Sequence, residues 1–499
     1  MDRSARPSGP SPNRVRLLLI AVLLVAASSV LSGCGGSRST TVPPADSALA
    51  VSALHDDLRV LRDTLLAVHP AFADAGAAAD TLRAAVRRAQ AALTSPMTAC
   101  GFFGRVAPLV TARDDGHTFV GFPARCLNTF STEARVFPFD VALTDSAAVV
   151  LRSYTDGPVG PGARIVAING RPLSALRPQL LAQLPGARTP YRRQQLEGRS
   201  DTFKFLLWQR GLRAPFDLTL RGDDRRRTVG GVSPDIIRAR RPDATAPPYA
   251  YRRLDAHTGL MTLRTFEVAE DDFKGFLDAT FERLRRDETA HLLVDVRGNG
   301  GGQSGRAEAL LRYLAASPVA LNDTVAVRAS ALFKARMKQR IPAAVRWLPV
   351  QFLDRRGRAV WGVPEGEMVA FPGERVEPHE ADERFDGRVT VLVDEGTFST
   401  ATLFAAAVRR EGIGTLLGRE TGGRAGHMFA QSVPVQLPHT GLWVRVSTMR
   451  FRFGETPPDG ADRGVVPDRR VPRNVRAQIE GEDPILERAR TLDVPHTSN

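Results

Sequence analysis

Two glycine- and hydroxyl-rich segments follow apolar runs of the sequence and carry groups suited to acyl-transfer chemistry. The first, residues 297–305, directly follows the largely apolar run 292–296 and contains three consecutive glycines at 300–302. Bare backbone N–H groups at the start of a helix bind anions and developing oxyanions. The second, residues 394–402, places Ser399 before an alanine-rich helical stretch. A serine at a helix N-terminus is most often a cap, so its chemistry depends on what lies beside it.

Two histidines are candidate bases for a serine nucleophile. His117 lies in the polar turn that follows the third predicted helix, and His427 follows Ser399 in the sequence. An imidazole ordinarily titrates near neutral pH, so it is suited to activating a hydroxyl group. The alternative for His117 is a capping or surface histidine without a chemical role.

The glycine-rich turn also satisfies a dinucleotide-binding pattern, through Gly300, Gly302 and Gly305. That pattern needs an acidic residue about 20 positions further on, at the next strand, and none is found there. The sequence contains no His-x-x-x-His or Cys-x-x-Cys pair that would indicate a metal site. We therefore expect neither a nucleotide, a metal nor another cofactor.

Composition and charge are those of an ordinary globular protein with an excess of arginine. The 499 residues are 43% hydrophobic and 24% charged, with a formal charge of +14. The basic residues are spread along the chain without interleaved aromatics, so we expect no nucleic-acid partner. Lysine is confined to four positions, which are Lys204, Lys274, Lys334 and Lys338.

The N-terminus predicts export and lipid anchoring. Residues 1–33 combine arginines, an apolar run and small residues, as signal peptides do. The apolar run is too short for a stable transmembrane helix, which needs about 20 residues. Residues 31–34, Leu-Ser-Gly-Cys, match the bacterial lipobox, which predicts lipidation of Cys34, and residues 34–46 read as a flexible tether. We expect a protein of the bacterial cell envelope, anchored to a membrane and facing the periplasm or exterior.

Cys100 and Cys126 are the two cysteines that remain. In an exported protein such a pair favours a disulfide, since neither cysteine lies in a redox or zinc motif. The alternative is two separate buried thiols.

The hydrophobic pattern divides the chain into regions of different secondary structure. Residues 47–130 show leucine stripes at helical spacing, such as Leu54, Leu58, Leu61 and Leu65. Residues 131–245 change to short strands and turns, and the Gly/Pro-rich approach to the strand and Asn-Gly turn at 157–170 resembles a PDZ domain, here with a helical insertion. Residues 246–475 alternate strands and helices, which predicts an α/β core with a largely parallel sheet, interrupted by an insertion or lid at 318–386. A C-terminal helix and tail follow the core at 476–499.

Four motifs in order resemble one family of enzymes. The segments 295–301 (DVRGNGG), 397–401 (TFSTA), 418–423 (GRETGG) and 464–468 (GVVPD) are similar to those of the C-terminal processing, or tail-specific, serine peptidases and of their relative, the tricorn core protease. The resemblance implies a crotonase/ClpP-like α/β core of serine peptidase type. It also implies Ser399 as the nucleophile, with backbone N–H groups of Gly301, or a neighbouring glycine, and of Thr400 as the oxyanion hole.

The residue that acts as the general base distinguishes two branches of that family. Tail-specific members use a lysine where this chain has Arg424, and an arginine stays protonated and cannot act as a general base. His117 resembles the histidine that the tricorn-like branch uses as the general base, and His427 is the alternative candidate for that role. Because Gly116 stands where tricorn has serine, the group that orients His117 stays open, and Asp462 or Glu455 is expected to supply the carboxylate.

We therefore expect a serine peptidase of the cell envelope that cleaves protein or peptide substrates through an acyl-enzyme, without metal or cofactor. The PDZ-like region is expected to bind free C-termini of substrates at the strand edge near residues 137–140. The alternative is a catalytically inactive relative that binds peptides or hydrophobic ligands in the same cleft.

Lipidation at Cys34 leads to a direct test. One acyl chain anchors a protein only weakly, so stable anchoring requires the further chains of a lipoprotein. The full-length protein is expected to enter the detergent phase on Triton X-114 partitioning, and Cys34→Ser is expected to return it to the aqueous phase. Detergent-phase partitioning that survives Cys34→Ser would contradict the prediction.

Overall fold

The computed structural model describes residues 47–492 except 75, 113–114, 133, 199–200, 242–245, 344–345, 350–351, 353–354 and 455–462. The predicted signal peptide, the lipidation site Cys34 and the tether lie outside the described residues. Among the helices of the described part, none combines the length and apolar character that crossing a bilayer requires.

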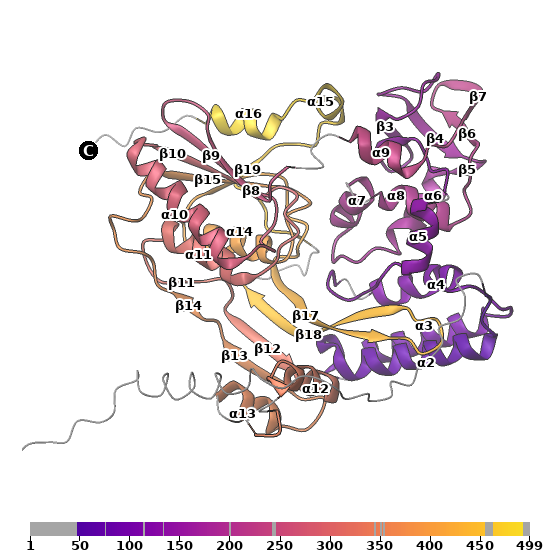
Figure 1. Cartoon of the computed structure of the whole chain (residues 1–499), viewed down its shortest axis with the longest axis horizontal. Coiled ribbons are helices and arrows are strands. Elements are labelled where there is room, and N and C mark those ends of the chain that lie inside the picture. The colour runs from indigo at the N-terminus through magenta and orange to yellow at the C-terminus, as the bar shows by residue number, and fades with distance from the viewer. Residues whose placement is uncertain are drawn as a thin grey trace, which may run out of the picture. The chain divides into compact units, whose positions relative to one another are not determined.

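A six-stranded sheet forms the centre of the α/β region, in the order β19–β16–β15–β10–β9–β8 (Figure 1). All neighbouring pairs are parallel except β8 with β9. The strands are β8 (Tyr249–Arg253), β9 (Thr258–Leu263), β10 (His291–Asp295), β15 (Arg388–Val393), β16 (Thr415–Gly418) and β19 (Arg469–Arg470). The predicted α/β class and its largely parallel sheet are confirmed.

Helices cover both faces of this sheet, which is why its strands are continuous apolar runs. Apolar side chains of one face pack with helices α10 (Glu270–Arg286), α11 (Ser304–Leu314) and α14 (Thr400–Arg410). Leu293, Leu392 and Leu417 on the other face pack with α16 (Pro484–Arg490). The predicted cap of α16 is present, since Asp483 accepts a hydrogen bond from the Leu486 N–H at 3.0 Å. Helix α15 (Val475–Glu480) precedes it.

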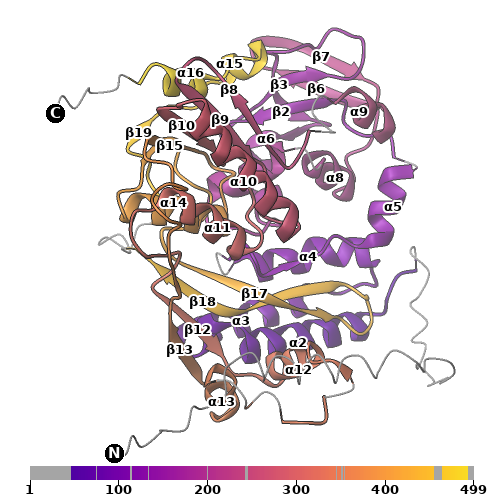
Figure 2. The same ribbon diagram turned by 60° about the vertical axis from the view of Figure 1, so that its left-hand side comes forward.

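A second sheet is built on a long hairpin, β17 (Gly426–Gln436) and β18 (Trp443–Phe453). Strand β18 pairs with β17 along its length and, on its other edge, with β1 (Phe119–Val120) and β12 (Thr324–Arg328). Strand β13 (Met368–Pro372) continues the sheet beside β12. Figure 2 shows this hairpin lying between α4 (Ala99–Thr111) and the helices α2 (Val51–Val68) and α3 (Ala77–Ala91).

The segment 318–386, expected to be an insertion or lid without clean periodicity, thus supplies two strands of this sheet. Their pairing partner β18 is far away in the sequence, so a local pattern could not reveal it. The other elements of the segment are β11 (Val319–Ala320), α12 (Ala331–Gln339), α13 (Arg355–Trp361) and β14 (Arg375–Val376).

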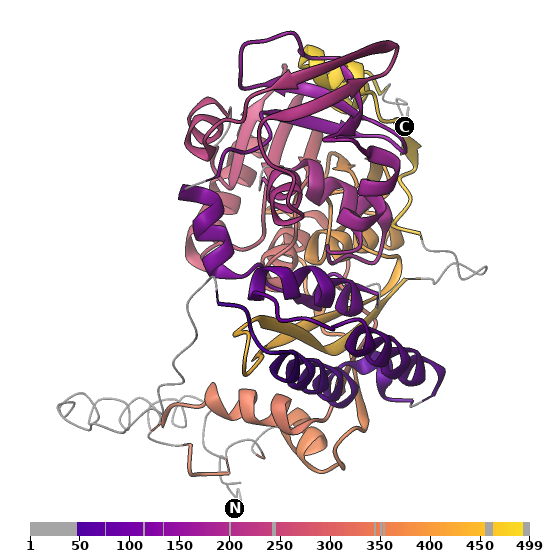
Figure 3. The same cartoon turned by 90° about the vertical axis from the view of Figure 1, so that its right-hand side faces the viewer.

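The predicted PDZ-like region is a sheet in the order β2–β3–β4–β6–β7, with helices inserted before β6. Its strands are β2 (Phe139–Leu143), β3 (Ala148–Ser153), β4 (Arg164–Ile168), β5 (Arg171–Pro172), β6 (Phe216–Leu220) and β7 (Asp223–Val229). The inserted helices are α6 (Leu173–Leu181), α7 (Thr189–Glu197) and α8 (Thr202–Gln209), and α9 (Pro234–Arg240) follows β7. Figure 3 shows these elements above the N-terminal helices.

Side chains of α8 cover the residues at which we expected a free C-terminus to bind. Phe137 and Phe139 are buried, and Phe137 packs edge-on against Phe203 of α8. The Lys204 Nζ of the same helix donates to Asp140 Oδ1 at 2.6 Å. The side chains at this edge therefore contact the inserted helix, and binding of free C-termini there stays a prediction.

One hydrophobic core joins the N-terminal helices, the PDZ-like sheet and the far part of the β17–β18 hairpin. A disulfide links Cys100 of α4 to Cys126 of α5 (Ala124–Thr132), with 6.0 Å between the two Cα atoms. The tip of the hairpin is held by the buried carboxylate of Asp57 in α2. It accepts hydrogen bonds from the His439 N–H at 3.0 Å, the Thr440 N–H at 2.9 Å and the Thr440 hydroxyl at 2.6 Å.

We expect Asp57→Ala to reduce the free energy of unfolding by about 3 kcal/mol, because it leaves buried donors of the hairpin tip without an acceptor. Asp63→Ala, which removes a mostly exposed carboxylate of the same helix, serves as the control and is expected to change stability by less than about 0.5 kcal/mol. Urea unfolding followed by circular dichroism measures both. Equal losses for the two variants would show that the hairpin tip does not depend on Asp57.

Candidate functional site

Ser399 lies at the carboxyl end of the central sheet, in the turn between β15 and α14. Its backbone has φ 54° and ψ −126°, a conformation that residues other than glycine rarely adopt. Its side chain makes no capping hydrogen bond to the helix. The strained turn instead presents the hydroxyl to the opposite side of a cleft, so the capping role that a serine at this position most often has does not apply.

His117 reaches Ser399 from a distant part of the chain. Its Nε2 lies 2.9 Å from the Ser399 Oγ, which is hydrogen-bonding distance for proton transfer from the hydroxyl. When Nε2 accepts this hydrogen bond, the neutral ring carries its proton on Nδ1. The structure therefore brings together the nucleophile and the base that the resemblance implied.

Strand β18 aligns the His117 segment with the core. Phe119 and Val120 pair with it in antiparallel register, and the Gly121 N–H donates to the Trp443 carbonyl at 2.7 Å. At the start of the segment the Ser447 N–H donates to the Thr118 Oγ1 at 2.9 Å. His117 is thus held two residues from a β-ladder, which limits how far its ring can move.

The carboxylate of Asp115, two residues before His117, binds three partners in a buried position. Its Oδ1 accepts the His117 backbone N–H at 2.8 Å. Its Oδ2 accepts the Ser447 hydroxyl at 2.6 Å and lies 3.1 Å from the His69 Nε2. Because the Ala71 N–H donates to the His69 Nδ1 at 3.1 Å, the ring proton of His69 is on Nε2 and points at Asp115.

These contacts keep Asp115 ionised. Burial would raise its pKa, but the hydrogen bonds from His117 and His69 outweigh burial and hold the pKa well below its ordinary value. The Nδ1 of His117 lies 3.7 Å from the Asp115 Oδ1, close enough for electrostatic stabilisation of an imidazolium although too long for a hydrogen bond. Asp115 is the carboxylate that lies beside His117 in the described part of the chain, and the sequence analysis did not single it out. The predicted Asp462 and Glu455 lie outside the described residues, so their assignment stays a prediction. The signal in the sequence that could have identified Asp115 is its position two residues before the candidate base.

Aromatic stacking fixes the His117 ring from its other side. The ring stacks on Phe398 with 5.0 Å between centroids, and Phe398 stacks on Tyr191 at 4.2 Å. A Cβ added to Gly116 would lie 2.2 Å from the Phe398 ring. Gly116, which departs from the tricorn pattern, is therefore required by the packing of the residue next to the nucleophile.

The glycine-rich turn lies against Ser399, as the resemblance implied. Strands β10 and β15, which precede the two turns, are direct neighbours, and a Cβ on Gly301 would lie 2.6 Å from the Ser399 Cβ. However, the Gly301 N–H already donates to the Asn299 Oδ1 at 2.8 Å, so it is committed within the turn. Among the described residues the Thr400 N–H has no acceptor, and Gly300 and Gly302 line the cleft. Of the two expected oxyanion donors, the Thr400 N–H is available to bind an oxyanion. The second donor is then the N–H of a glycine next to Gly301.

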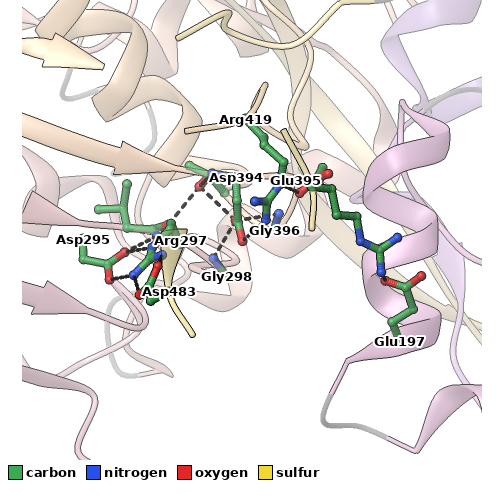
Figure 4. A network of polar contacts seen from close by, with 12 residues as sticks. Glu197, Asp295, Arg297, Gly298, Asp394, Glu395, Gly396, Arg419 and Asp483 are labelled. Atoms are coloured by element: carbon green, nitrogen blue, oxygen red, sulfur yellow. Dashed lines mark hydrogen bonds and ion pairs between the residues drawn. The ribbon is translucent and has the colours of Figure 1, made fainter. Parts of the chain in front are cut away.

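Buried charges brace both turns from beneath, as Figure 4 shows. The Asp394 Oδ1 accepts the Gly298 N–H at 2.8 Å and the Gly396 N–H at 2.9 Å, and so links the two turns. Burial raises the pKa of Asp394 despite these bonds. Arg297 is fixed between Asp295 and Asp483, which together hold its guanidinium in place.

His427, the rival base, lies in β17 and makes no hydrogen bond to Ser399. Burial and the neighbouring Arg424, Arg450 and Arg452 lower its pKa. The carboxylate of Glu420 is paired with Arg188 at 2.5 Å and with Arg463 at 2.7 Å. The geometry therefore favours His117 over His427.

A groove of about 1050 Å³ leads away from Ser399 and His117. Its floor is apolar and comes largely from the second sheet, and its far wall comes from α12 and α13. The groove has the size to bury a peptide segment rather than a single small molecule. In the described part of the chain no group of histidine, cysteine and carboxylate side chains is arranged to hold a metal ion.

Comparison with known proteins gives a family and a fold. The model of peptidase family S41 matches residues 257–471. No curated protein sequence matches the chain. The solved structure of mature CPAF is similar with TM-score 0.60 and 16% identity, over 88% of this chain and 96% of that chain. CPAF complexed with lactacystin gives TM-score 0.61 and 17% identity, over 88% and 97%.

The tricorn protease aligns over 87% of this chain and 36% of that chain, with TM-score 0.36 and 14% identity. The likeness to CPAF shows a shared fold, which is that of an α/β serine peptidase.

Asp115→Asn is expected to lower turnover by about 10²-fold or more, because the amide has one acceptor oxygen in place of two and carries no charge to stabilise an imidazolium. Ser447→Ala, which removes one hydrogen bond and keeps the charge, is the matched control and is expected to cost less than about tenfold. Steady-state peptide hydrolysis measures both. Similar losses in the two variants would assign Asp115 a packing role only.

The depressed pKa of Asp115 also predicts a pH dependence of stability. The folded state binds fewer protons than the unfolded state, so the stabilisation is present above the ordinary carboxyl pKa of about 3.9 and is lost as the pH falls below it. Asp115→Asn should therefore be less stable than the wild type at pH 7, and the difference should shrink at acid pH. A difference that stays constant down to pH 3 would contradict this assignment.

Proposed function

We propose that this protein is a serine peptidase in which Ser399 and His117 hydrolyse peptide bonds, because the model of peptidase family S41 matches residues 257–471. The family match confirms the resemblance to C-terminal processing peptidases that the four motifs indicated. The observation that carries the proposal is the 2.9 Å contact between the His117 Nε2 and the Ser399 Oγ.

The geometry supports acyl transfer in two stages. As the Ser399 Oγ attacks the substrate carbonyl carbon, its proton passes to the His117 Nε2, and the C=O electron pair moves onto the oxygen. The Thr400 N–H and a glycine N–H of the turn stabilise this oxyanion. His117 then gives its proton to the leaving amine as the C–N bond breaks. In the second stage a water molecule attacks the acyl carbon while His117 takes one of its protons. His117 returns that proton to the Ser399 Oγ as the ester C–O bond breaks and the acid product leaves.

Asp115 supports this cycle without exchanging a proton. Its negative charge stabilises the imidazolium that His117 forms in both stages. A lysine base is excluded at the tail-specific position, where Arg424 stands, and no lysine follows Lys338 in the sequence.

We also propose that the enzyme acts in the bacterial cell envelope, anchored through lipid on Cys34 and facing the periplasm or exterior. The support is the lipobox that follows the signal-like segment. Substrates are then exported proteins or peptides. Binding of free C-termini of such substrates at residues 137–140 stays a prediction, since side chains of α8 contact that edge.

The second candidate function is peptide binding without catalysis, which the sequence alone left open. A fluorophosphonate probe separates the two, because it forms a covalent bond only with an activated serine. Labelling at Ser399, lost in Ser399→Ala, supports a peptidase. Absence of labelling in a folded wild-type protein would favour the binding role.

His117→Ala is expected to lower turnover by about 10² to 10⁴-fold, with Ser399→Ala as severe and the double variant little worse, because the two groups act as a unit. Activity of the wild type should rise with pH and reach a plateau, since only the neutral imidazole accepts the proton. Hydrolysis of an internally quenched peptide between pH 5 and 9 measures this. Full activity of His117→Ala together with loss in His427→Ala would move the base to His427.

A further inference from the structure

The far end of the groove carries an uncompensated positive charge. Arg336 of α12 and Arg340, the C-cap residue of that helix, line the groove, and both are exposed. Among the described residues, no carboxylate lies within ion-pair distance of either guanidinium. Arg336 has one long contact, 3.5 Å to the Gln339 Oε1.

Helix geometry accounts for only part of this arrangement. Arg336 lies in the last turn of α12, where a cation is favourable, whereas Arg340 follows the helix as its C-cap residue. Residues 331–349 contain five basic residues and no aspartate or glutamate. Local ion pairs therefore do not account for two arginines at the border of the groove.

The other charges of the groove do not neutralise this end. Arg356 on α13 is paired with Glu374 at 2.6 Å, and Glu267 accepts a hydrogen bond from Gln303 at 3.0 Å. Glu308 is partly buried, and burial together with Glu374 raises its pKa. Arg445, another groove residue, adds a further cation without an ion pair among the described residues.

Apolar side chains also line the groove. Its floor presents side chains from three strands of the second sheet, which are Val325, Val327, Phe371, Met449 and Phe451. Phe333 and Met337 of α12 complete it on the side of the arginines. An extended peptide lying here meets both apolar surface and cations.

We propose that Arg336 and Arg340 form a specificity subsite for an acidic side chain of the peptide substrate, a few residues away from an apolar stretch beside the scissile bond. This inference rests on the proposed peptidase function. Guanidinium groups bind carboxylates with two hydrogen bonds, which selects aspartate or glutamate over their amides.

The test uses internally quenched peptides with an apolar core in which one aspartate, or one asparagine, is moved stepwise along the chain. The wild type is expected to cleave the aspartate peptide about tenfold faster in kcat/KM at one position, with the advantage shrinking at high salt. Arg336→Glu/Arg340→Glu is expected to lose this preference and to favour the matching lysine peptide. Its rate of fluorophosphonate labelling should not change, because the catalytic groups are untouched.

Lys338→Glu, compared with Arg336→Glu alone, is the matched control, since each variant reverses one charge on α12 and Lys338 does not line the groove. It is expected to leave the aspartate preference within about twofold. Binding of fluorescent aspartate and asparagine peptides to Ser399→Ala repeats the comparison without turnover. An aspartate preference in binding thus supports the subsite even where turnover fails.

Three results would overturn the inference. The first is equal binding and cleavage of aspartate and asparagine peptides at every position. The second is an equal effect of Lys338→Glu, which would indicate a general field of the helix. The third is unchanged peptide preference in the double charge reversal, accompanied by loss of binding to phosphatidylglycerol vesicles, which would assign the arginines to a membrane surface.

Discussion

The site depends on one buried carboxylate that joins three distant parts of the chain. Asp115 accepts hydrogen bonds from its own loop, from His69 at the end of α2 and from Ser447 in β18. A buried charge is stable only when its partners surround it, so each of these segments holds the others in place. The position of His117, and with it any chemistry of Ser399, follows from this arrangement.

The β17–β18 hairpin connects the α/β core to the N-terminal helices. Its first strand follows the motif at residues 418–423. The apolar residues at its other end belong to the same hydrophobic cluster as those of α2 and α4. Asp57 fixes the tip of the hairpin, and β1 pairs with Val444 and Arg445 close to that tip. A base and a nucleophile from different regions are thereby held within 2.9 Å.

The sequence predicted those features that local patterns encode. The strands and helices of the core, the Ser399 turn and the cap at Asp483 follow from apolar runs, glycines and capping residues next to one another. His117 was identified by resemblance, because nothing near it in the sequence places it beside Ser399. Asp115, the Gly301–Asn299 bond and strands β12 and β13 were missed, since their partners or roles appear only after distant segments meet.

The separation of 282 residues between His117 and Ser399 has a consequence for the life of the chain before folding is complete. During synthesis from the N-terminus, the base is made long before the nucleophile, and the strand that positions the base is made after both. A nascent chain that ends before Ser447 lacks part of the support of Asp115. The order of synthesis thus delays assembly of the complete site until β18 has been made, so a shorter nascent chain holds the base and the nucleophile without the strand that brings them together.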